Sequence, residues 1–237
     1  MQDRKIYFII VAAGGGTRFG GDIPKQFRQL GGKTVLCHSI DTFTRYCRQT
    51  GVSGEIIIVL SQAGKEFWNE HESSAYPGVA IVPGGATRAE SVSNAIDTIK
   101  DFSEEDIIMV HDGARPLISC NLLRRLSDAV TGGCRAVVPA LAPTDSLMEK
   151  TDGSGAMPVD RSRFLAVQTP QAFKAEVLKK SYASQKEDIA RMTDDASVVF
   201  AATFTPIEYI EGEVSNIKVT NPADLPLAEI LLTQCCR

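Results

Sequence analysis

Runs of apolar residues alternate along the chain with stretches in which apolar residues recur every three or four positions. The apolar runs predict buried strands at 6–11, 55–60, 79–82, 106–110, 136–139 and 164–168, and shorter strands at 205–210 and 216–219. The amphipathic stretches predict helices at 35–46, 65–72, 87–99, 121–130, 174–185, 194–202 and 222–233. This alternation is typical of an α/β domain with a mainly parallel twisted sheet flanked by helices.

One segment departs from the alternation. Residues 144–163 are polar and rich in turn formers, with Asp152-Gly153-Ser154-Gly155 at the centre and two flanks that could pair as a hairpin. No internal repeat, low-complexity tract or linker interrupts the rest. We therefore expect a single domain spanning 1–237, with a protruding β-arm at about 144–163.

Composition narrows the class of protein. The 237 residues are 43% hydrophobic and 23% charged, and their net charge of −4 argues against a nucleic-acid surface as the main role.

No apolar run approaches the roughly 18 residues of a membrane-spanning helix, and MQDRK leads directly into a strand without a signal-peptide layout. The six cysteines lack a C-x-x-C pair and the three histidines lack metal spacing. We expect reduced thiols, no zinc site, no membrane partner and a cytoplasmic location.

A glycine-rich loop follows the first strand. Gly14, Gly15 and Gly16 come first, and the cations Arg18 and Lys25 follow. Glycines let the backbone approach an anion closely, and successive N–H groups form an anion-binding concavity. The spacing fits neither the Walker A motif nor the dinucleotide-binding fingerprint. The loop therefore favours phosphate binding without naming the ligand.

Further polar residues follow other predicted strands. In an open parallel sheet, ligands bind beyond the carboxyl ends of the strands. A capping-box pattern, Thr87 with Glu90, begins the helix after the third strand. The residues predicted to meet at this edge or in the last strand are Gly84, Gly85, Arg88, Asp112, Arg115, Thr169 and Lys218. Several cations, exposed backbone and one carboxylate together suit a nucleoside triphosphate with Mg²⁺.

Taken singly, each charged residue has an ordinary structural explanation. Arg88 could pair with Glu90 or Asp97, Arg161 could pair with Asp160, and Asp112 could cap a turn. Lysines after a proline or in a short strand are commonly solvated. The joint placement at strand ends, rather than any one residue, favours a functional site.

Six segments occur along the chain in a fixed order: AAGGGTRFGGDIPKQF, VPGGATRAESV, VHDGARP, VDRSRFLAVQTPQAF, TDDASV and NIKVTNPADL. Together they resemble the 2-C-methyl-D-erythritol 4-phosphate cytidylyltransferase family, the CTP-using enzymes of the non-mevalonate isoprenoid pathway. The resemblance covers about residues 5 to 233. Ribitol-5-phosphate cytidylyltransferases share several of these segments and stay open as the alternative. A non-catalytic module that senses CTP is the alternative from another class.

The resemblance implies a Rossmann-like nucleotidyltransferase fold and a homodimer in which an arm of one subunit reaches the active site of the other. It implies transfer of CMP from CTP to 2-C-methyl-D-erythritol 4-phosphate, giving 4-CDP-2-C-methyl-D-erythritol and pyrophosphate, with Mg²⁺. The matching nucleotide-binding residues are Ala12, Ala13, Gly14, Gly15, Gly16, Gly85, Arg88 and Ser91. Arg18 and Lys25 match the catalytic cations. The matching substrate-positioning residues are Arg161, Lys218, Asp112, Arg115, Ser146 and Thr169, with Asp112 also a candidate metal ligand.

Charge then suggests the mechanism. An oxygen of the acceptor phosphate attacks the α-phosphorus of CTP in line, and pyrophosphate leaves. The attacking group is already an anion, so no general base is needed. The difficulty is to bring two anions together and to stabilise the charge of the transition state, which fixed cations do. The presence of Arg18, Lys25 and an acceptor set favours catalysis over sensing.

Overall fold

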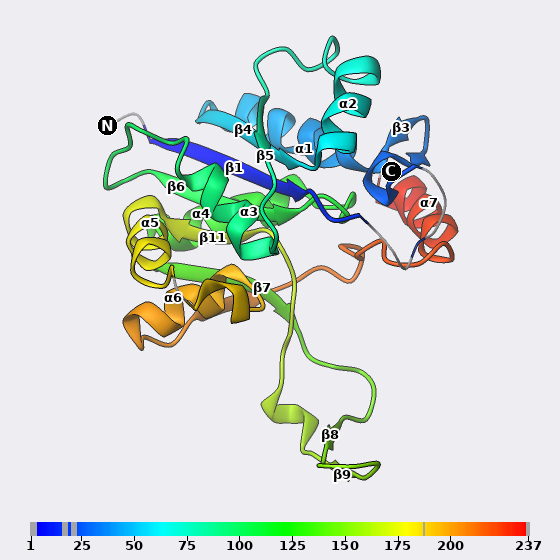
Figure 1. The fold of residues 1–237 in the computed structure, drawn as a ribbon, viewed down its shortest axis with the longest axis vertical. Coiled ribbons are helices and arrows are strands. Elements are labelled where there is room, and N and C mark those ends of the chain that lie inside the picture. The colour runs from blue at the N-terminus through cyan, green and yellow to red at the C-terminus, as the bar shows by residue number, and fades with distance from the viewer. Residues whose placement is uncertain (1–3, 16–18, 20–22, 187, 236–237) are drawn as a thin grey trace.

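The computed structural model of the protein describes residues 4–15, 19, 23–186 and 188–235. Within these residues one sheet has the strand order β10-β7-β11-β6-β1-β4-β5, with β12 paired to β7 (Figure 1). Its strands are β1 (Lys5–Ala12), β4 (Ser53–Leu60), β5 (Ala80–Pro83), β6 (Ile107–Asp112), β7 (Ala136–Leu141), β10 (Ala166–Val167), β11 (Gln171–Lys174) and β12 (Glu208–Glu211).

Most pairings in this sheet are parallel. β1 lies between β4 and β6 and runs parallel to both, β5 runs parallel to β4, and β12 runs parallel to β7. β10 and β11 are antiparallel to their neighbours. The predicted mainly parallel sheet is confirmed. β11 was not predicted, because Gln171 and Lys174 leave only two apolar residues in it, Ala172 and Phe173.

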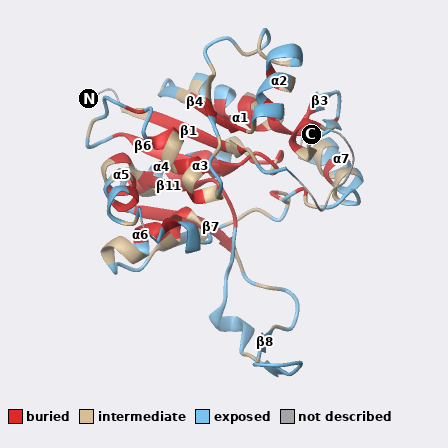
Figure 2. Ribbon diagram, viewed as in Figure 1, coloured by how far each residue is buried: buried red, intermediate tan, exposed pale blue. Residues whose placement is uncertain are grey.

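The side chains of β1 alternate between two cores. Ile6, Phe8 and Ile10 face one cluster, whereas Tyr7 and Ile9 face the other. Three helices supply the first cluster: α1 (Val35–Thr50), α2 (Gln62–His71) and α4 (Cys120–Thr131). Three helices supply the second: α3 (Arg88–Ile96), α5 (Ala175–Ser184) and α6 (Asp195–Thr203). Both faces of the sheet are therefore covered, as parallel strands require, and Figure 2 shows the buried sheet between them.

The last helix, α7 (Asp224–Cys235), closes a third cluster. Its Ala228 packs with Leu30 of β2 (Gln29–Leu30) and with Val219. β2 pairs with β3 (Lys33–Thr34) just before α1. This packing places the chain around Val219 against elements from the N-terminal quarter. All seven predicted helices are present, with ends shifted by at most four residues.

The segment between β7 and β10 projects from the body as an arm (Figure 1). It carries an antiparallel hairpin, β8 (Met148–Lys150) with β9 (Ala156–Pro158), and the short helix η2 (Arg161–Arg163). Nearly all of the arm is exposed (Figure 2). The protruding β-arm of the predicted fold is present.

Two predicted strands need correction. The strand expected at 164–168 is reduced to Ala166–Val167, because the chain before it still belongs to the arm. Residues 216–219 form no strand: Val219 N donates to the carbonyl of Ala114, whereas Ile217 N turns back to Ser215. Two further short 3₁₀ helices are η1 (Lys25–Phe27) and η3 (Ile189–Arg191). None of the described helices is long and apolar enough to cross a membrane.

Candidate active site

A cavity of about 370 Å³ opens at the carboxyl ends of β1, β5 and β6. Ten of its lining residues were predicted from sequence as site residues: Ala12, Ala13, Gly14, Gly15, Lys25, Gly85, Arg88, Ser91, Asp112 and Lys218. These residues span almost the whole chain. The expectation that strand ends would gather them at one edge is met for this set.

The remaining predicted residues lie elsewhere. Arg115 and Thr169 are next to the cavity but do not line it. Ser146 and Arg161 lie on the arm, away from the cavity of their own chain. Arg18 and Gly16 fall outside the described residues.

Glycines let the loops around the cavity pack closely. A Cβ on Gly84 would lie 2.4 Å from the Cβ of Ala13, and a Cβ on Gly113 would lie 2.9 Å from that of Ala12. By contrast, a Cβ on Gly14 or Gly15 would meet no described atom within 4 Å. Gly84 and Gly113 therefore serve loop packing, whereas Gly14 and Gly15 present backbone to the cavity with no described atom against it.

The first turn of α3 places Arg88 at the cavity. Thr87 caps the helix by accepting from Glu90 N at 3.1 Å, as predicted. Glu90 reaches one residue further back than the capping-box pattern implies and accepts from Ala86 N at 2.8 Å. Ser91 accepts from Gly85 N at 3.0 Å. These bonds fix the turn that precedes Arg88.

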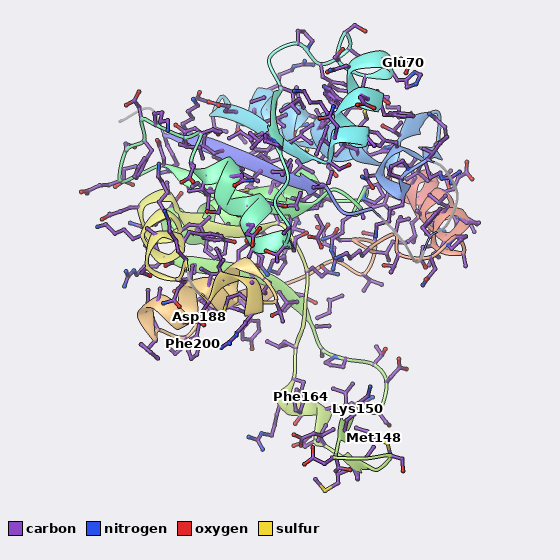
Figure 3. All side chains as sticks on the ribbon, viewed as in Figure 1. Glu70, Met148, Lys150, Phe164, Asp188 and Phe200 are labelled. Carbon is purple, nitrogen blue, oxygen red and sulfur yellow. The ribbon has the colours of Figure 1, made fainter. Side chains whose placement is uncertain are left out.

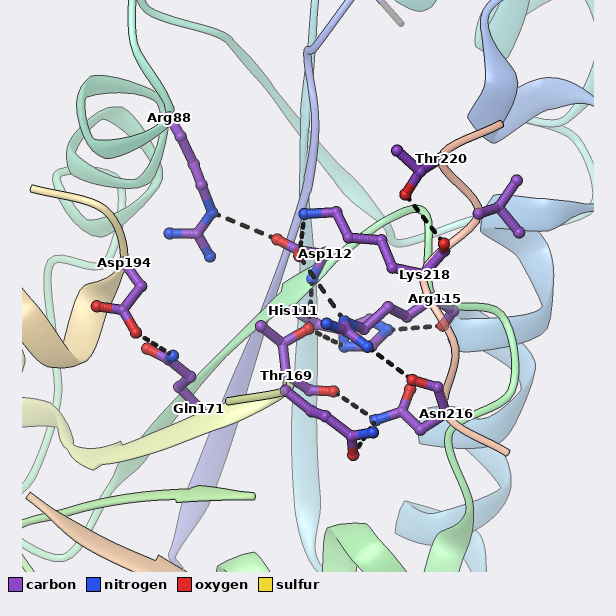
Figure 4. A network of polar contacts seen from close by, with 12 residues as sticks. Arg88, His111, Asp112, Arg115, Thr169, Gln171, Asp194, Asn216, Lys218 and Thr220 are labelled. Carbon is purple, nitrogen blue, oxygen red and sulfur yellow. Dashed lines mark hydrogen bonds and ion pairs between the residues drawn. The ribbon is translucent and has the colours of Figure 1, made fainter. Parts of the chain in front are cut away.

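Asp112, at the end of β6, is the centre of a charged network (Figure 4). Its carboxylate lies 2.7 Å from Lys218 Nζ, 3.3 Å from Arg88 Nε and 3.8 Å from Arg115 Nε. Burial alone would raise the pKa of Asp112, but Arg88, Lys218 and Arg115 outweigh it and hold that pKa well below its usual range. Asp112 is therefore an anion that brings three cations together.

Arg88 has a second acidic partner that the sequence did not reveal. Its Nη2 lies 2.9 Å from Oδ2 of Asp195, the first residue of α6. Burial alone would lower the pKa of Arg88, but Asp195 and then Asp112 raise it above its ordinary value. Neither Glu90 nor Asp97 forms the ion pair with Arg88 that a local explanation would need. Arg88, which follows β5, thus links Asp112 at the end of β6 to Asp195 at the start of α6.

A network of buried hydrogen bonds supports Asp112. Asp112 N donates to Thr169 Oγ1 at 3.0 Å, and Thr169 Oγ1 lies 3.1 Å from His111 Nδ1. Asn216 Nδ2 donates to the Thr169 carbonyl at 2.8 Å, while Arg115 Nη1 donates to the Asn216 carbonyl at 2.6 Å. Burial lowers the pKa of His111 to about 4. In this arrangement Thr169 and Arg115 hold the site together from outside the cavity.

The two lysines of the cavity come from opposite ends of the chain. Lys25, in η1, donates from Nζ to the carbonyl of Val219 at 2.9 Å. Gln26 Nε2 donates to the Ala12 carbonyl at 2.7 Å, which ties η1 to the end of β1. Lys218 lies in an irregular segment, so its predicted position in a strand is wrong. The bond to Val219 places Lys25 next to that segment.

Asp112 is also the carboxylate at the cavity that could contact a divalent cation. Among the described residues, no group of three or more His, Cys, Asp or Glu side chains could hold a metal ion by themselves. Mg²⁺ needs fewer protein ligands, since it is commonly bound by one or two carboxylates and by substrate phosphates. Asp112, which already pairs with Lys218, Arg88 and Arg115, could therefore contact such an ion only together with the phosphates of a bound nucleotide.

Comparison with known proteins identifies the family. Residues 6–234 match the model of the IspD family, 2-C-methyl-D-erythritol 4-phosphate cytidylyltransferase. The chain belongs to this family. The cytidylyltransferase of that name from Bacteroides thetaiotaomicron is 38% identical over 228 residues, covering 94% of this chain and 98% of the relative. That from Porphyromonas gingivalis is 38% identical over 236 residues, covering 98% and 100%.

Solved structures agree with this assignment. The 4-diphosphocytidyl-2C-methyl-D-erythritol synthase from Anaerococcus prevotii superposes with a TM-score of 0.81 at 27% identity, covering 98% of this chain and 100% of that one. The family and the nucleotidyltransferase fold inferred from the six segments are confirmed. IspD membership also confirms a CTP-dependent cytidylyltransferase and does not favour the ribitol 5-phosphate alternative.

Proposed function

We propose that the protein transfers CMP from CTP to 2-C-methyl-D-erythritol 4-phosphate, and that the cavity at the ends of β1, β5 and β6 is its nucleotide site. The observation that best supports this is the meeting of open glycine backbone with Lys25, Lys218 and Arg88 around one cavity. Two anionic substrates need such a set of fixed cations to approach each other.

The nucleotide is held from two sides. The backbone at Gly14 and Gly15 can approach a phosphate closely, because neither residue has a side chain and no described atom lies within 4 Å of an added Cβ. At the α3 side, the cavity is lined by Gly85, Arg88 and Ser91. We assign these residues to contacts with the cytosine. Lys25, with Arg18, would stabilise the negative charge on the α-phosphate oxygens as pyrophosphate leaves.

The acceptor phosphate approaches from the side of Lys218. Lys218 Nζ lies 2.7 Å from Asp112, which holds the lysine at the cavity edge. An oxygen of this phosphate forms the new bond to the α-phosphorus while the bond to pyrophosphate breaks. The attacking oxygen already carries negative charge, so the residues of the site need only orient it and exclude water.

Asp112 would provide the protein contact for Mg²⁺. Such an ion neutralises charge on the phosphate oxygens of a bound nucleotide. Asp112 suits this role because its carboxylate stays ionised beside Arg88 and Lys218.

We also propose that the protein is a homodimer of single nucleotidyltransferase domains, in which Arg161 and Ser146 serve the active site of the partner subunit. The arm at about 144–163 carries both residues. Its Met148, Met157 and the adjoining Phe164 are 65%, 54% and 46% exposed, and Figure 3 shows Met148 and Phe164 far from the body. Exposed apolar side chains on a projecting hairpin favour burial against another chain.

The guanidinium of Arg161 is bonded within the arm, and its expected surface ion pair with Asp160 does not form. Its guanidinium donates to the carbonyl of Thr144 at the base of the arm. Asp160 instead accepts from Ser162 N at 3.0 Å and from Ser162 Oγ at 2.7 Å. Arg161 therefore has no ion pair with Asp160 among the described contacts, which supports a role in binding an external anion.

We place the enzyme in the cytoplasm. The cysteines Cys37, Cys47, Cys120 and Cys134 are free thiols. Free thiols are the usual state of cysteines in a reducing compartment.

The direct test is release of pyrophosphate from CTP, Mg²⁺ and 2-C-methyl-D-erythritol 4-phosphate. Ribitol 5-phosphate replaces the acceptor in one control, and UTP, ATP or GTP replaces CTP in others. We expect turnover with CTP and methylerythritol phosphate well above every control. Equal or faster turnover with ribitol 5-phosphate would contradict the proposed substrate.

A further inference from the structure

Asp195 is a buried carboxylate that pairs with Arg88 but does not itself line the cavity. It follows Asp194, which caps α6 by accepting from Ser197 N at 2.9 Å. One cap needs only one carboxylate, yet Asp195 is 0% exposed. Burying an ionised group is costly unless partners compensate it, so the contacts of Asp195 must explain its presence.

The contacts of Asp195 lead to the cavity. Tyr182 of α5 donates from its hydroxyl to Asp195 Oδ1 at 2.6 Å. Arg88 Nη2 lies 2.9 Å from Asp195 Oδ2, but the pair lacks the alignment of a hydrogen bond and is an ion pair. Tyr182 of α5 thus fixes one oxygen of the Asp195 carboxylate, and the other oxygen faces Arg88.

The start of α6 is itself firmly held. Gln171 of β11 donates from Nε2 to Asp194 at 2.7 Å, which Figure 4 shows, and it accepts from Ala196 N at 3.0 Å. Gln171 is 1% exposed. The backbone on both sides of Asp195 is therefore anchored to the central sheet, and Asp195 has little freedom to follow Arg88.

Two carboxylates together restrain one guanidinium. Arg88 Nε contacts Asp112 at 3.3 Å, and Arg88 Nη2 contacts Asp195 at 2.9 Å. These contacts use two different nitrogens of the planar guanidinium, so together they restrain its position and its plane. They also balance the charge of Arg88 within the protein.

We propose that Asp195, supported by Tyr182, is a positioning residue that holds Arg88 at the nucleoside side of the cavity and away from the phosphates of CTP. The inference rests on the proposed function, because it takes Arg88 as a contact of the cytosine. Without Asp195, Arg88 would remain paired with Asp112 alone and could turn toward a triphosphate. CTP would then bind in a less defined orientation.

The test compares Asp195→Asn with Asp106→Asn. Asp106 is also buried, at 5% exposure, and accepts from Lys5 N and Ser103 N at 2.9 Å just before the opposite end of β6. The Asn variant of Asp195 keeps the size of the side chain and removes its charge. We expect Asp195→Asn to raise KM for CTP by roughly tenfold and to change KM for the methylerythritol phosphate by less than about threefold.

Both variants should lower the melting temperature, since each removes a buried, bonded carboxylate. Only Asp195→Asn should change KM for CTP. An unchanged KM for CTP in folded Asp195→Asn, or an equal rise for both substrates, would overturn the proposal. If Asp195→Asn does not fold, Tyr182→Phe is measured instead; it loses the hydroxyl contact and should raise KM for CTP by about threefold. An unchanged value there would overturn the proposal too.

A double mutant separates this inference from the proposed function. If Asp195 acts through Arg88, then Asp195→Asn should leave KM for CTP unchanged in an Arg88→Gln background. A further severalfold rise in that background would overturn the positioning role while leaving the role of Arg88 intact. If Arg88→Gln by itself leaves KM for CTP unchanged, the assignment of Arg88 to the nucleotide is wrong and the inference falls with it.

Discussion

Lys25 Nζ donates a hydrogen bond of 2.9 Å to the carbonyl oxygen of Val219, across 194 residues of chain. Val219 is fully buried, and its own N–H donates to Ala114 at 2.8 Å. The carbonyl is therefore a fixed point, and it holds the ammonium group of Lys25 at the cavity that Lys218 also lines. One short segment thus places cations from both ends of the chain at one site.

Replacing Lys25 with alanine should abolish most turnover and leave the fold intact. Removing one fixed group that stabilises transition-state charge typically costs about 10²- to 10³-fold in kcat. Pyrophosphate release measures kcat, and circular dichroism checks the fold. Lys33→Ala is the matched control, because Lys33 pairs with Asp41 outside the cavity lining. Near-normal turnover of Lys25→Ala would contradict the role of Lys25.

Gly14→Ala should weaken CTP binding without destabilising the protein. The added Cβ would meet no described atom within 4 Å, so we expect it to act through contact with the bound nucleotide. We expect KM for CTP to rise by about tenfold or more, while the melting temperature changes by less than about 2 °C.

Gly84→Ala provides the contrasting variant. Its Cβ would lie 2.4 Å from the Cβ of Ala13, so it should lower the melting temperature as well as the affinity for CTP. The account would be wrong if Gly14→Ala left CTP kinetics untouched, or if the two variants were equally destabilised.

Arg161→Ala should impair the acceptor more than the nucleotide. Loss of a cation that binds the acceptor phosphate should raise KM for the methylerythritol phosphate by roughly tenfold to a hundredfold, with a small effect on KM for CTP. Arg163→Ala is the control, because Arg163 is exposed in the same short helix and has no proposed role. Equal effects on the two substrates, or equal effects of the two variants, would count against Arg161.

Chelation of divalent cations should stop turnover without unfolding the protein. The described residues contain no self-sufficient metal cluster, and Asp112 would act together with substrate phosphates. We expect EDTA to abolish pyrophosphate release, Mg²⁺ to restore it, and the melting temperature of the free enzyme to stay the same. A large drop in melting temperature with EDTA would instead indicate a structural metal.

The part of the site at strand ends could be predicted because topology fixes where strands end. Asp112 directly follows an apolar run, and Gly14 and Gly85 follow two others, so a parallel sheet brings them to one edge. The continuous apolar run of residues 6–11 likewise predicted a buried strand, and its side chains fill the cores on both faces of the sheet. The pattern of apolar residues depends only on neighbouring positions, and so do the strand ends and the buried first strand that it predicts.

Contacts between distant segments could not be predicted in the same way. Lys218 was expected in a strand, but its segment is held by single bonds such as Val219 N to Ala114. Asp195 contacts Arg88, 107 positions earlier, and neither sequence pattern points to the other. The only local signal was the doublet Asp194-Asp195, since one helix cap needs one carboxylate.

The arm shows a further limit. Its polarity and central turn identified it as a projecting hairpin. The residues that it would contribute to catalysis, Arg161 and Ser146, do not line the cavity of their own chain. A role for them therefore depends on a second chain.

Coexpression of Lys25→Ala and Arg161→Ala subunits tests the composite site most directly. If Arg161 serves the partner subunit, each mixed dimer contains one intact site, with Lys25 from one chain and Arg161 from the other. Random pairing should then restore about a quarter of wild-type activity, although each variant alone is nearly inactive at low acceptor concentration. Activity no higher than the average of the two separate variants would show that Arg161 does not act across the dimer, and would contradict the account.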